Sequence, residues 1–475
     1  MSNQSAYNCL NSTDIDFFYR ILPQECVKTD KDSLEAAAKD YTEDFSFLPA
    51  IVLFPRDTQE VAALMKHCYQ RNLPVTPRGA GTGLSGGALP VYGGVVLAMA
   101  KMNQLLCLDE ENLQVSVQPG MITQHLQELV EAKGLFYPPD PSSRGSSFIG
   151  GNLAESSGGP RAVKYGVSKD YVLNLEVVLP NGTIMETGAK VLKNATGYNL
   201  TQLMVGSEGT LGIITRIDLR LIPLPKMNWL MLVPFVSPEK ACEAVSAVFR
   251  AGLCPSALEF MEREGILFTL KYRPDLNFPL PDEANAMLLI EVDGNSEEEL
   301  MNQCEGINRV LEAFAPSDVW MATTSSEKEA LWKVRRAIGE AVKSHSIYKE
   351  EDTVVPRFQL PALLRKVKEL GKTYGFESVC YGHAGDGNLH VNIIRGNLSQ
   401  EAWENELPKA IRELFEYVKS LGGTLSGEHG IGWVQKNYMD IALSTAALDL
   451  MKGIKKLFDP KEILNPGKIF PDKEA

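Results

Sequence analysis

Short apolar runs separated by turns alternate with helical stretches from Ala50 to about Leu224. The runs AIVLF, GVVLAM, LQVSVQPG and LNLEVVLPNG are typical of strands, and TQEVAALMKHCYQRN carries its apolar residues at helical spacing. Residues 1–45 are expected to be mostly helical, with Thr13 or Asp14 as the cap before IDFFYRIL. The pattern therefore predicts an N-terminal helical segment over residues 1–45 and an α+β domain over residues 46–225.

A second alternation of strands and helices begins near Asn228. The runs NWLMLVPF and AMLLIEVDG are strand-like, whereas residues 238–251 and the stretch SEEELMNQCEGINRVLEAF are helix-like. This rhythm predicts a domain over residues 226–440 that is built on an antiparallel sheet with helices on one face. Residues 441–475 contain a further helix, DLMKGIKKLFDP, and we expect them to pack back on the first domain.

Composition narrows the classes of function. The chain has 475 residues, of which 47 are basic and 60 acidic, so its net charge of −13 argues against a nucleic acid or an anionic membrane as the main partner. Its eight cysteines form no CxxC pair, which fits a reducing compartment. The sequence shows no signal or transit pattern and no apolar run of about 18 residues. We therefore expect a cytoplasmic protein without a transmembrane segment.

A glycine-rich stretch, PRGAGTGLSGGALP, spans Pro77 to Pro90 and contains a formal GxGxxG. A dinucleotide-binding fold of the Rossmann type needs a helix to begin at this loop. Here Pro90 and the glycines at 93 and 94 exclude a helix of useful length, so that interpretation is rejected. The loop can still wrap an anionic phosphate with its backbone N–H groups, and an ordinary flexible hairpin loop is the alternative.

Two more segments of this kind follow, PDPSSRGSSFIGGNLAESSGGPRAVKYG at residues 139–166 and VGSEGTLGIIT at residues 205–215. The first is too long for a loop that only connects two elements, because loops beyond about 12–15 residues are usually functional or disordered. Three glycine- and serine-rich segments in one domain indicate a large, elongated ligand that bears phosphates.

The stretch YGHAGDGNLHV, residues 381–391, holds two of the six histidines of the chain. A hairpin with AGDG as its turn pairs Tyr381 with His390 and places His383, Asn388 and His390 on one face of the sheet. Two neutral imidazoles and a carboxylate suit a catalytic zinc or non-haem iron site, and Glu428 in SGEHGIG is the candidate carboxylate. The alternative is a pair of hydrogen-bonded core histidines.

His429 follows Glu428 directly and stands between two glycines, Gly427 and Gly430. The glycines permit a turn that would bring both side chains to one pocket. A histidine whose pKa is near neutrality is a suitable general base, and a structural or helix-capping histidine is the alternative.

The order of these motifs resembles the FAD-binding domain of the vanillyl-alcohol oxidase/p-cresol methylhydroxylase flavoprotein family. The ending, with GHAGDGNLH, SGEHGIG and ILNPGK, resembles the branch of FAD-linked 2-hydroxy-acid dehydrogenases, which includes the glycolate oxidase flavin subunit, D-lactate dehydrogenases and D-2-hydroxyglutarate dehydrogenase. The resemblance covers roughly residues 40–470. It implies a two-subdomain FAD-binding domain and an antiparallel substrate (cap) domain. Because no histidine occurs between His67 and His125, we expect the FAD to be non-covalent.

The resemblance also implies FAD contacts along all three glycine-rich segments and near the C-terminus. These residues are Pro77, Arg78, Gly79, Ala80, Gly81, Thr82, Gly83, Leu84, Ser85, Gly86, Asp140, Ser143, Gly150, Gly151, Asn152, Ala154, Ser157, Gly158, Gly159, Tyr165, Gly166, Glu208, Gly209, Gly212, Ile213, Ile214 and Asn465.

For the chemistry, the resemblance implies a divalent metal, with zinc favoured over iron or manganese, on His383, His390 and Glu428. It makes His429 the base that takes the hydroxyl proton of a D-2-hydroxy acid. It implies substrate contacts from three residues, Arg335, Lys349 and Asn388. D-2-hydroxyglutarate dehydrogenases have a threonine four residues after the arginine, where this chain has Gly339. That departure favours a smaller monocarboxylate such as D-lactate or glycolate.

The sequence has no cysteine or haem motif that could carry electrons onward. We therefore expect an external acceptor, which could be oxygen, a quinone, an electron-transfer flavoprotein or an iron–sulfur subunit, and a homodimer is possible. The alternatives are a flavin-free metallohydrolase that uses the same three ligands, a non-catalytic FAD subunit of a larger complex, and an alkyl-glycerone-phosphate synthase. The last of these needs a histidine-rich run that this sequence lacks.

Overall fold

The computed structural model describes residues 7–42 and 45–472. The chain forms two compact units. Unit 1 holds the residues up to Ser157, then Val167–Leu224, then those from Glu428 onward, and unit 2 holds Gly158–Gly166 and Pro225–Gly427. The last crossing of the chain from unit 2 to unit 1 therefore falls inside the SGEHGIG motif.

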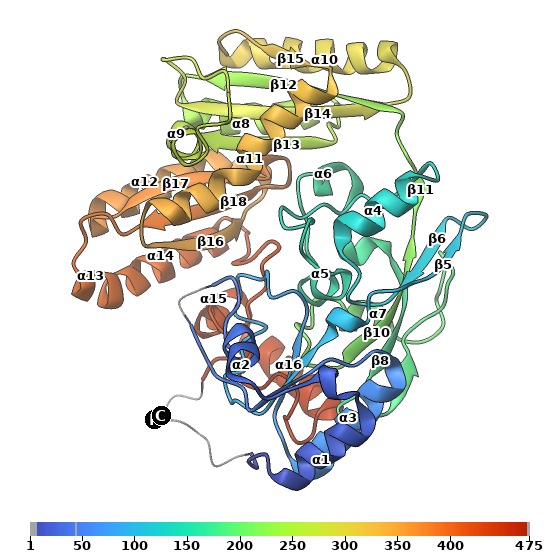
Figure 1. Ribbon diagram of the computed structural model, residues 1–475. Helices are drawn as coiled ribbons and strands as arrows, with labels where there is room; N and C mark the ends of the chain where they lie inside the picture. Colours follow the sequence, from blue (N-terminus) through green and yellow to red (C-terminus); the bar gives the residue numbers. More distant parts are fainter. Residues whose placement is uncertain (1–6, 43–44, 473–475) are drawn as a thin grey trace. The chain divides into compact units, whose positions relative to one another are not determined.

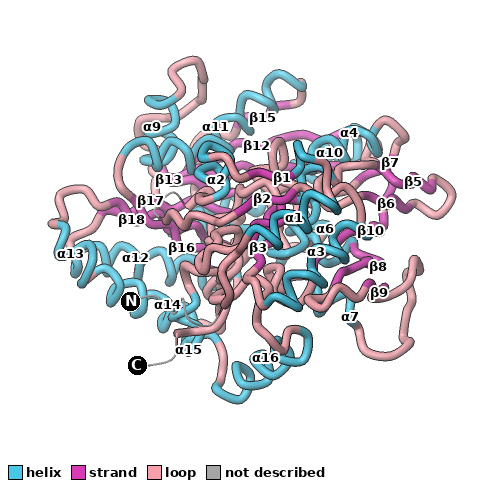
Figure 2. Tube along the Cα trace, turned by 60° about the horizontal axis from the view of Figure 1, so that its bottom comes forward, coloured by secondary structure: helices cyan, strands magenta, loops and turns pink. Residues whose placement is uncertain are grey.

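Unit 1 contains two sheets, each with its own apolar core. The first has the strand order β1-β2-β4-β3, in which β2, β4 and β3 run parallel, and the second has the order β5-β6-β10-β8-β9 and is antiparallel. Figure 2 shows strands in magenta. The strands of the first sheet are β1 (Val27–Lys28), β2 (Ile51–Leu53), β3 (Val75–Arg78) and β4 (Val95–Ala98). Those of the second are β5 (Leu105–Asp109), β6 (Gln114–Val117), β8 (Val172–Val178), β9 (Ile184–Glu186) and β10 (Ile213–Arg220), and β7 (Leu135–Phe136) pairs separately with β11 (Ile222–Pro223).

Helices of unit 1 bury one apolar stripe against these sheets. In α3 (Thr58–Arg71), Val61, Leu64 and Met65 enter the core of the first sheet, as the spacing of its apolar residues predicts. The others are α1 (Ser12–Ile21), α2 (Lys31–Ala37), α4 (Thr123–Glu131), α5 (Ile149–Glu155), α7 (Leu200–Met204), α15 (Met439–Ala442) and α16 (Thr445–Phe458). The structure has no helix between β3 and β4, so the rejection of a Rossmann loop is confirmed.

The cap of α1 differs from the sequence prediction. Asn11 is the N-cap, since its side-chain oxygen accepts from the N–H of Asp14 at 3.1 Å and the Asp14 carboxylate accepts from the N–H of Asn11 at 3.0 Å. Asp14 is buried and also accepts from Arg71 at 2.8 Å. Asp14 therefore completes a capping box at the third helical position, and neither it nor Thr13 is the cap.

The C-terminal segment is joined to unit 1 through a buried lysine of α16. The Lys455 ammonium donates to the Asp459 carboxylate at 2.7 Å and to the carbonyls of Thr210 and Leu464 at 2.8 Å each. The N–H of Asn465 donates to the Val75 carbonyl of β3 at 2.7 Å. These bonds hold the ILNPGK motif against β3 and the third glycine-rich segment.

Unit 2 is built on one antiparallel sheet with the strand order β15-β12-β14-β13-β17-β18-β16 (Figure 1). Its strands are β12 (Met227–Phe235), β13 (Ala257–Glu262), β14 (Ala286–Gly294), β15 (Trp320–Ala322), β16 (Tyr348–Val354), β17 (Glu377–Gly382) and β18 (Asn388–Ile394). The helices are α6 (Ala162–Tyr165), α8 (Pro238–Arg250), α9 (Arg263–Tyr272), α10 (Glu297–Leu311), α11 (Ser325–His345), α12 (Leu360–Tyr374), α13 (Gln400–Asn405) and α14 (Leu407–Ser420).

Helices cover both faces of this sheet. Strand β14 is buried at every position, which an antiparallel strand with one solvated face would not be. Leu230 and Leu232 share a core with residues of α9 and α11, while Met231, on the other face, is equally buried. The sequence predicts helices on one face of this sheet, whereas the structure has helices on both faces.

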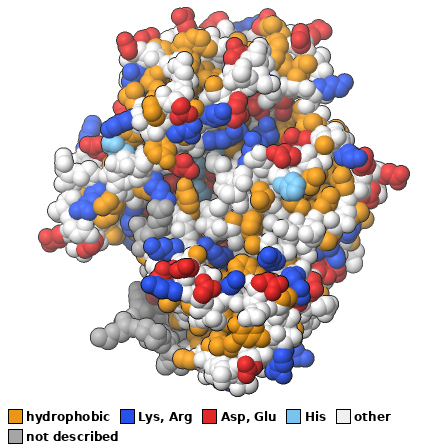
Figure 3. All heavy atoms as spheres, in the orientation of Figure 1, with side chains coloured by type: hydrophobic (Ala, Val, Ile, Leu, Met, Phe, Trp, Pro, Cys, Tyr) orange, Lys and Arg blue, Asp and Glu red, His pale blue; other side chains and the backbone are white. Residues whose placement is uncertain are grey.

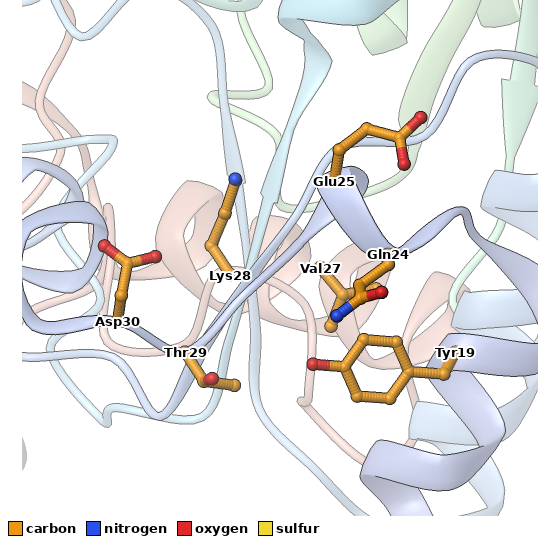
Figure 4. A pocket seen from close by; sticks show the side chains of 7 residues that line it. All are labelled: Tyr19, Gln24, Glu25, Val27, Lys28, Thr29 and Asp30. Carbon is orange, nitrogen blue, oxygen red and sulfur yellow. The ribbon is translucent and has the colours of Figure 1, made fainter.

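Surface features of the described residues add little to this picture. Acidic and basic side chains are interspersed on the face that Figure 3 shows. A shallow, open hollow of about 410 Å³ in unit 1 is lined by residues between Tyr19 and Asp30, and its side chains offer no histidine or cysteine (Figure 4). Among the residues described, no helix is both long and apolar enough to span a membrane.

Candidate active site

The histidine motif forms the hairpin that its sequence predicts. Tyr381 of β17 pairs with His390 of β18, and the N–H of Asn388 donates to the His383 carbonyl at 3.2 Å. The turn is one 3-10 turn, Ala384–Asp386, closed by Gly387 at φ +81°. Any side chain on Gly387 would collide with the Val355 carbonyl, so the turn requires glycine there.

The hairpin brings the two imidazoles together. His383 and His390 are 3% and 4% exposed, their ring centroids are 5.4 Å apart, and their planes cross at 83°. A ring nitrogen of one lies within 4.8 Å of a ring nitrogen of the other. Two buried imidazoles whose nitrogens converge are suited to share one ion.

A buried carboxylate orients the first imidazole. Both carboxylate oxygens of Glu259, on β13, lie 2.9 Å from Nδ1 of His383. Burial alone would raise the pKa of Glu259, but its interactions with His383 and Arg335 outweigh burial and hold that pKa below its usual value. The ionised carboxylate accepts the Nδ1 proton, which makes Nε2 of His383 the nitrogen that can coordinate a metal.

Replacing Glu259 with glutamine is expected to weaken metal binding by about 10- to 100-fold, because a carboxylate behind a histidine ligand fixes its tautomer and raises its basicity. Metal content after dialysis against buffers of defined free metal measures this change. Glu283→Gln, at an exposed site in the same unit, is the control. Equal metal affinity in the Glu259 variant and the control would contradict this role.

His390 has acidic neighbours on β16. Its Nδ1 lies 3.4 Å from the Glu350 carboxylate and 3.6 Å from that of Asp352, its register partner. Asp352 also holds the start of the SGEHGIG motif, since its carboxylate accepts from Ser426 Oγ at 3.0 Å and from the N–H of Gly427 at 2.8 Å. The motif therefore begins at the strand that pairs with His390, and Glu428 is the next residue along the chain.

Arg335, on α11, lies beside this cluster. Its guanidinium is 2.6 Å from Glu259 Oε2 and stacks over the Tyr381 ring at 4.9 Å. Arg335 is 3% exposed; its Nη2 is the atom that faces Glu259, and its Nε donates no hydrogen bond among the described residues. A buried guanidinium with donors to spare fits a carboxylate ligand.

The other two predicted substrate contacts are arranged differently. Lys349 pairs with Ile393 on the sheet face opposite His390, so the register keeps it out of the cluster. Asn388 lies on the correct face, but its amide donates to the Asp352 carboxylate at 2.7 Å and to the Thr353 carbonyl at 3.1 Å. Asn388 therefore links β18 to the neighbouring strand β16.

The sequence prediction missed Asn392. It stands two residues after His390 on the same face of β18 and is fully buried, and its amide lies near the Tyr381 hydroxyl without a hydrogen bond of normal geometry. The two-residue period of a strand, extended by one step beyond His390, would have identified it. We count Asn392 with Arg335 as a candidate substrate contact.

The three glycine-rich segments converge within unit 1. A Cβ on Gly79 would lie 3.6 Å from Gly151 Cα, and one on Gly209 would press on the Pro77 ring. The N–H of Glu208 donates to the Ala154 carbonyl at 2.8 Å, which joins the third segment to the second.

The predicted FAD contacts fall into two groups. Those at 77–86, 140–157 and 208–214, together with Asn465, lie in unit 1. The stretch 158–166, which includes Gly158, Gly159, Tyr165 and Gly166, belongs to unit 2, where the Tyr165 hydroxyl donates to the Asp293 carboxylate at 2.7 Å.

The glycine loops have the features of a phosphate cradle. The buried Nη1 of Arg78 donates no hydrogen bond within the described residues, and burial lowers the pKa of this guanidinium. A Cβ on Gly83 or Gly151 would meet no atom within 4 Å. An unsatisfied buried cation beside open backbone fits an anionic pyrophosphate.

Comparisons with known proteins agree with this geometry. Residues 49–188 match the family described as "FAD binding domain", and residues 224–469 match "FAD linked oxidases, C-terminal domain". The glycolate oxidase subunit GlcD of Bacillus subtilis is 42% identical over 436 residues, 91% of each chain. The D-lactate dehydrogenase of Anaerostipes hadrus is 38% identical over 472 residues, 98% of each chain.

Among solved structures, p-cresol methylhydroxylase superposes with a TM-score of 0.75 at 17% identity, over 97% of this chain and 96% of its own. This likeness confirms the fold that the glycine-rich motifs predict. The chain therefore belongs to the family of FAD-linked oxidases and is a flavoprotein oxidoreductase with a p-cresol methylhydroxylase-type fold.

Proposed function

We propose that this flavoprotein oxidises a small 2-hydroxy acid, D-lactate or glycolate, to the 2-oxo acid with the help of a divalent cation. Two curated relatives, 42% and 38% identical, are named for glycolate and D-lactate, and a third, from Stutzerimonas stutzeri and 34% identical, is named for D-2-hydroxyglutarate. The observation that carries the proposal is the buried pair of imidazoles, His383 and His390, with Glu259 behind the first. A carboxylate on one ring nitrogen leaves the other nitrogen to coordinate, which is the usual arrangement behind a histidine ligand of a metal.

His383 and His390 would hold the cation, with Glu428 as the third ligand. Glu428 is supported by its position in the chain. It directly follows Gly427, whose N–H donates a hydrogen bond to the Asp352 carboxylate on β16. Two imidazoles and one carboxylate favour zinc and are compatible with iron or manganese. A set of three ligands leaves positions open for a substrate.

A cation held there would supply a Lewis acid that favours ionisation of the substrate hydroxyl, and non-covalent FAD would supply the acceptor for the hydride on Cα. Arg335 would bind the substrate carboxylate through its Nε, which donates no hydrogen bond among the described residues. His429 takes the hydroxyl proton, and Asn392 orients the substrate oxygens from β18. The electrons then pass to an external acceptor, and the name of the B. subtilis relative makes a partner subunit a natural candidate.

A short substrate is favoured by the surroundings of Gly339. This residue lies one turn after Arg335 on α11, and a Cβ there would be 3.0 Å from the Tyr381 hydroxyl. That hydroxyl donates to the Glu350 carboxylate at 3.3 Å. A second substrate carboxylate would meet the phenol and a like charge, so we propose discrimination against D-2-hydroxyglutarate.

Tyr381→Ala is expected to lower the preference for D-lactate over D-2-hydroxyglutarate, expressed as a ratio of kcat/KM values, by about tenfold, because pocket contacts of this size contribute about 1–3 kcal/mol. Tyr381→Phe, which keeps the ring, is the matched control and should change the ratio less. The same ratio in the wild type and both variants would rule out Tyr381 as a determinant of chain length.

Turnover of a panel of D- and L-2-hydroxy acids with an artificial electron acceptor, with and without a chelator, tests the proposal. We expect D-lactate or glycolate to be oxidised and the chelator to abolish it. D-2-hydroxyglutarate as the best substrate would favour that dehydrogenase instead. A protein that holds FAD but reduces it with no acid would favour a non-catalytic subunit.

A further inference from the structure

The loop that follows His429 is held by a single buried carboxylate. Glu208 Oε1 accepts from the N–H of Ile431 at 2.8 Å, and its Oε2 accepts from the N–H of Gly432 at 2.6 Å. Glu208 is 7% exposed. Burial raises the pKa of Glu208 to about 7, although the two N–H donors and Lys468 act in the opposite direction.

Glu208 is itself fixed in an unusual backbone conformation. Its φ is +51°, in the left-handed region that residues other than glycine rarely adopt. The Asn465 amide donates to its carbonyl at 2.8 Å, and its own N–H donates to the Ala154 carbonyl at 2.8 Å. Strain of this kind persists where the surroundings determine the geometry, which is common at functional sites.

Two further residues of the glycine-rich segments hold the same loop. The carbonyl of Ser85 accepts from the N–H of Trp433 at 2.8 Å, and the Ser85 hydroxyl donates to Glu155 Oε1 at 3.0 Å. Glu155 Oε2 is buried and lies where a Cβ of Gly430 would be. Each of the three segments thus places one residue against the loop 430–433: Glu208 and Ser85 accept hydrogen bonds from it, and Glu155 packs against Gly430.

We propose that Glu208 is a positioning residue for His429: by holding the N–H groups of Ile431 and Gly432, it fixes the direction in which the imidazole is presented. This inference rests on the proposed role of His429 as the base. It also departs from the expectation that Glu208 contacts FAD, because both carboxylate oxygens are occupied by the loop. The third glycine-rich segment would then align the base.

Glu208→Gln in the FAD-saturated holoenzyme tests the inference, since an amide can accept from only one of the two N–H groups through its oxygen. We expect flavin reduction by D-lactate to slow by about 10- to 100-fold, because even a small misplacement of a reacting group lowers the rate by about this much. FAD content should be unchanged, and the solvent isotope effect on flavin reduction should increase, because proton transfer becomes more limiting. Amide hydrogen exchange at Ile431 and Gly432 should accelerate. Glu111→Gln, at an exposed site of the same unit, is the control.

Glu208→Asp keeps the charge and replaces the glutamine variant if that variant does not fold; an intermediate rate would support the inference. An unchanged reduction rate, loss of FAD, or a slow rate without a larger solvent isotope effect would each overturn it. Failure of the wild type with every 2-hydroxy acid would instead overturn the proposed function, so the two failures are distinct.

Discussion

Replacing His390 with alanine is expected to remove the bound metal and to lower kcat/KM for D-lactate by at least about 10³-fold. His390 and His383 would supply the two nitrogen ligands, and an ion that lowers the pKa of a hydroxyl contributes several kcal/mol to the reaction. Metal analysis of the purified variant, together with turnover at saturating artificial acceptor, measures both effects.

His345→Ala is the matched control, because His345 is an exposed histidine of the same unit that stacks on Phe268. It should keep both metal and activity. The His390 variant should keep its FAD, since the residues expected to hold the pyrophosphate belong to unit 1 and do not include His390. Full activity in a metal-free His390 variant would show that the reaction needs no cation there.

The second large effect is expected for His429→Asn, which keeps a polar side chain but cannot take a proton. Flavin reduction should slow by about 10²- to 10⁴-fold, the usual contribution of a positioned general base. FAD and metal should both remain bound. Rapid-mixing measurements of flavin bleaching across pH give the result: the wild-type rate should rise with pH as a histidine loses its proton, and the variant should lose that rise.

The control for this change is His125→Asn, at an exposed position on α4. Unchanged flavin reduction in the His429 variant would place the base elsewhere. A variant that has lost its metal would instead show that the segment 428–429 acts mainly through metal binding.

The sequence predicts the hairpin correctly because its turn and the pairing of its strands are determined by residues that are close together in the chain. The turn AGDG and the two-residue period of the strands fix the pairing of Tyr381 with His390, and the structure confirms it. The absence of a helix after the first glycine-rich segment can also be predicted from neighbouring residues, since the proline and glycines that follow exclude a helix.

The partners of the histidines could not be predicted in this way. Glu259 reaches His383 because β13 and β17 are neighbours in the sheet, although more than a hundred residues separate the two side chains in sequence. The register of β16 against β18 likewise decides that Lys349 lies on the opposite face. Both facts depend on strand order, which no local pattern contains.

The most direct test of the account is an anaerobic absorption spectrum of the purified protein before and after D-lactate or glycolate is added. We predict flavin bands that bleach on addition of the acid, that fail to bleach after the metal is chelated, and that bleach again when zinc is restored. Flavin bands that bleach equally well in the chelated protein would contradict the metal-assisted mechanism, and the absence of flavin bands would contradict the whole account.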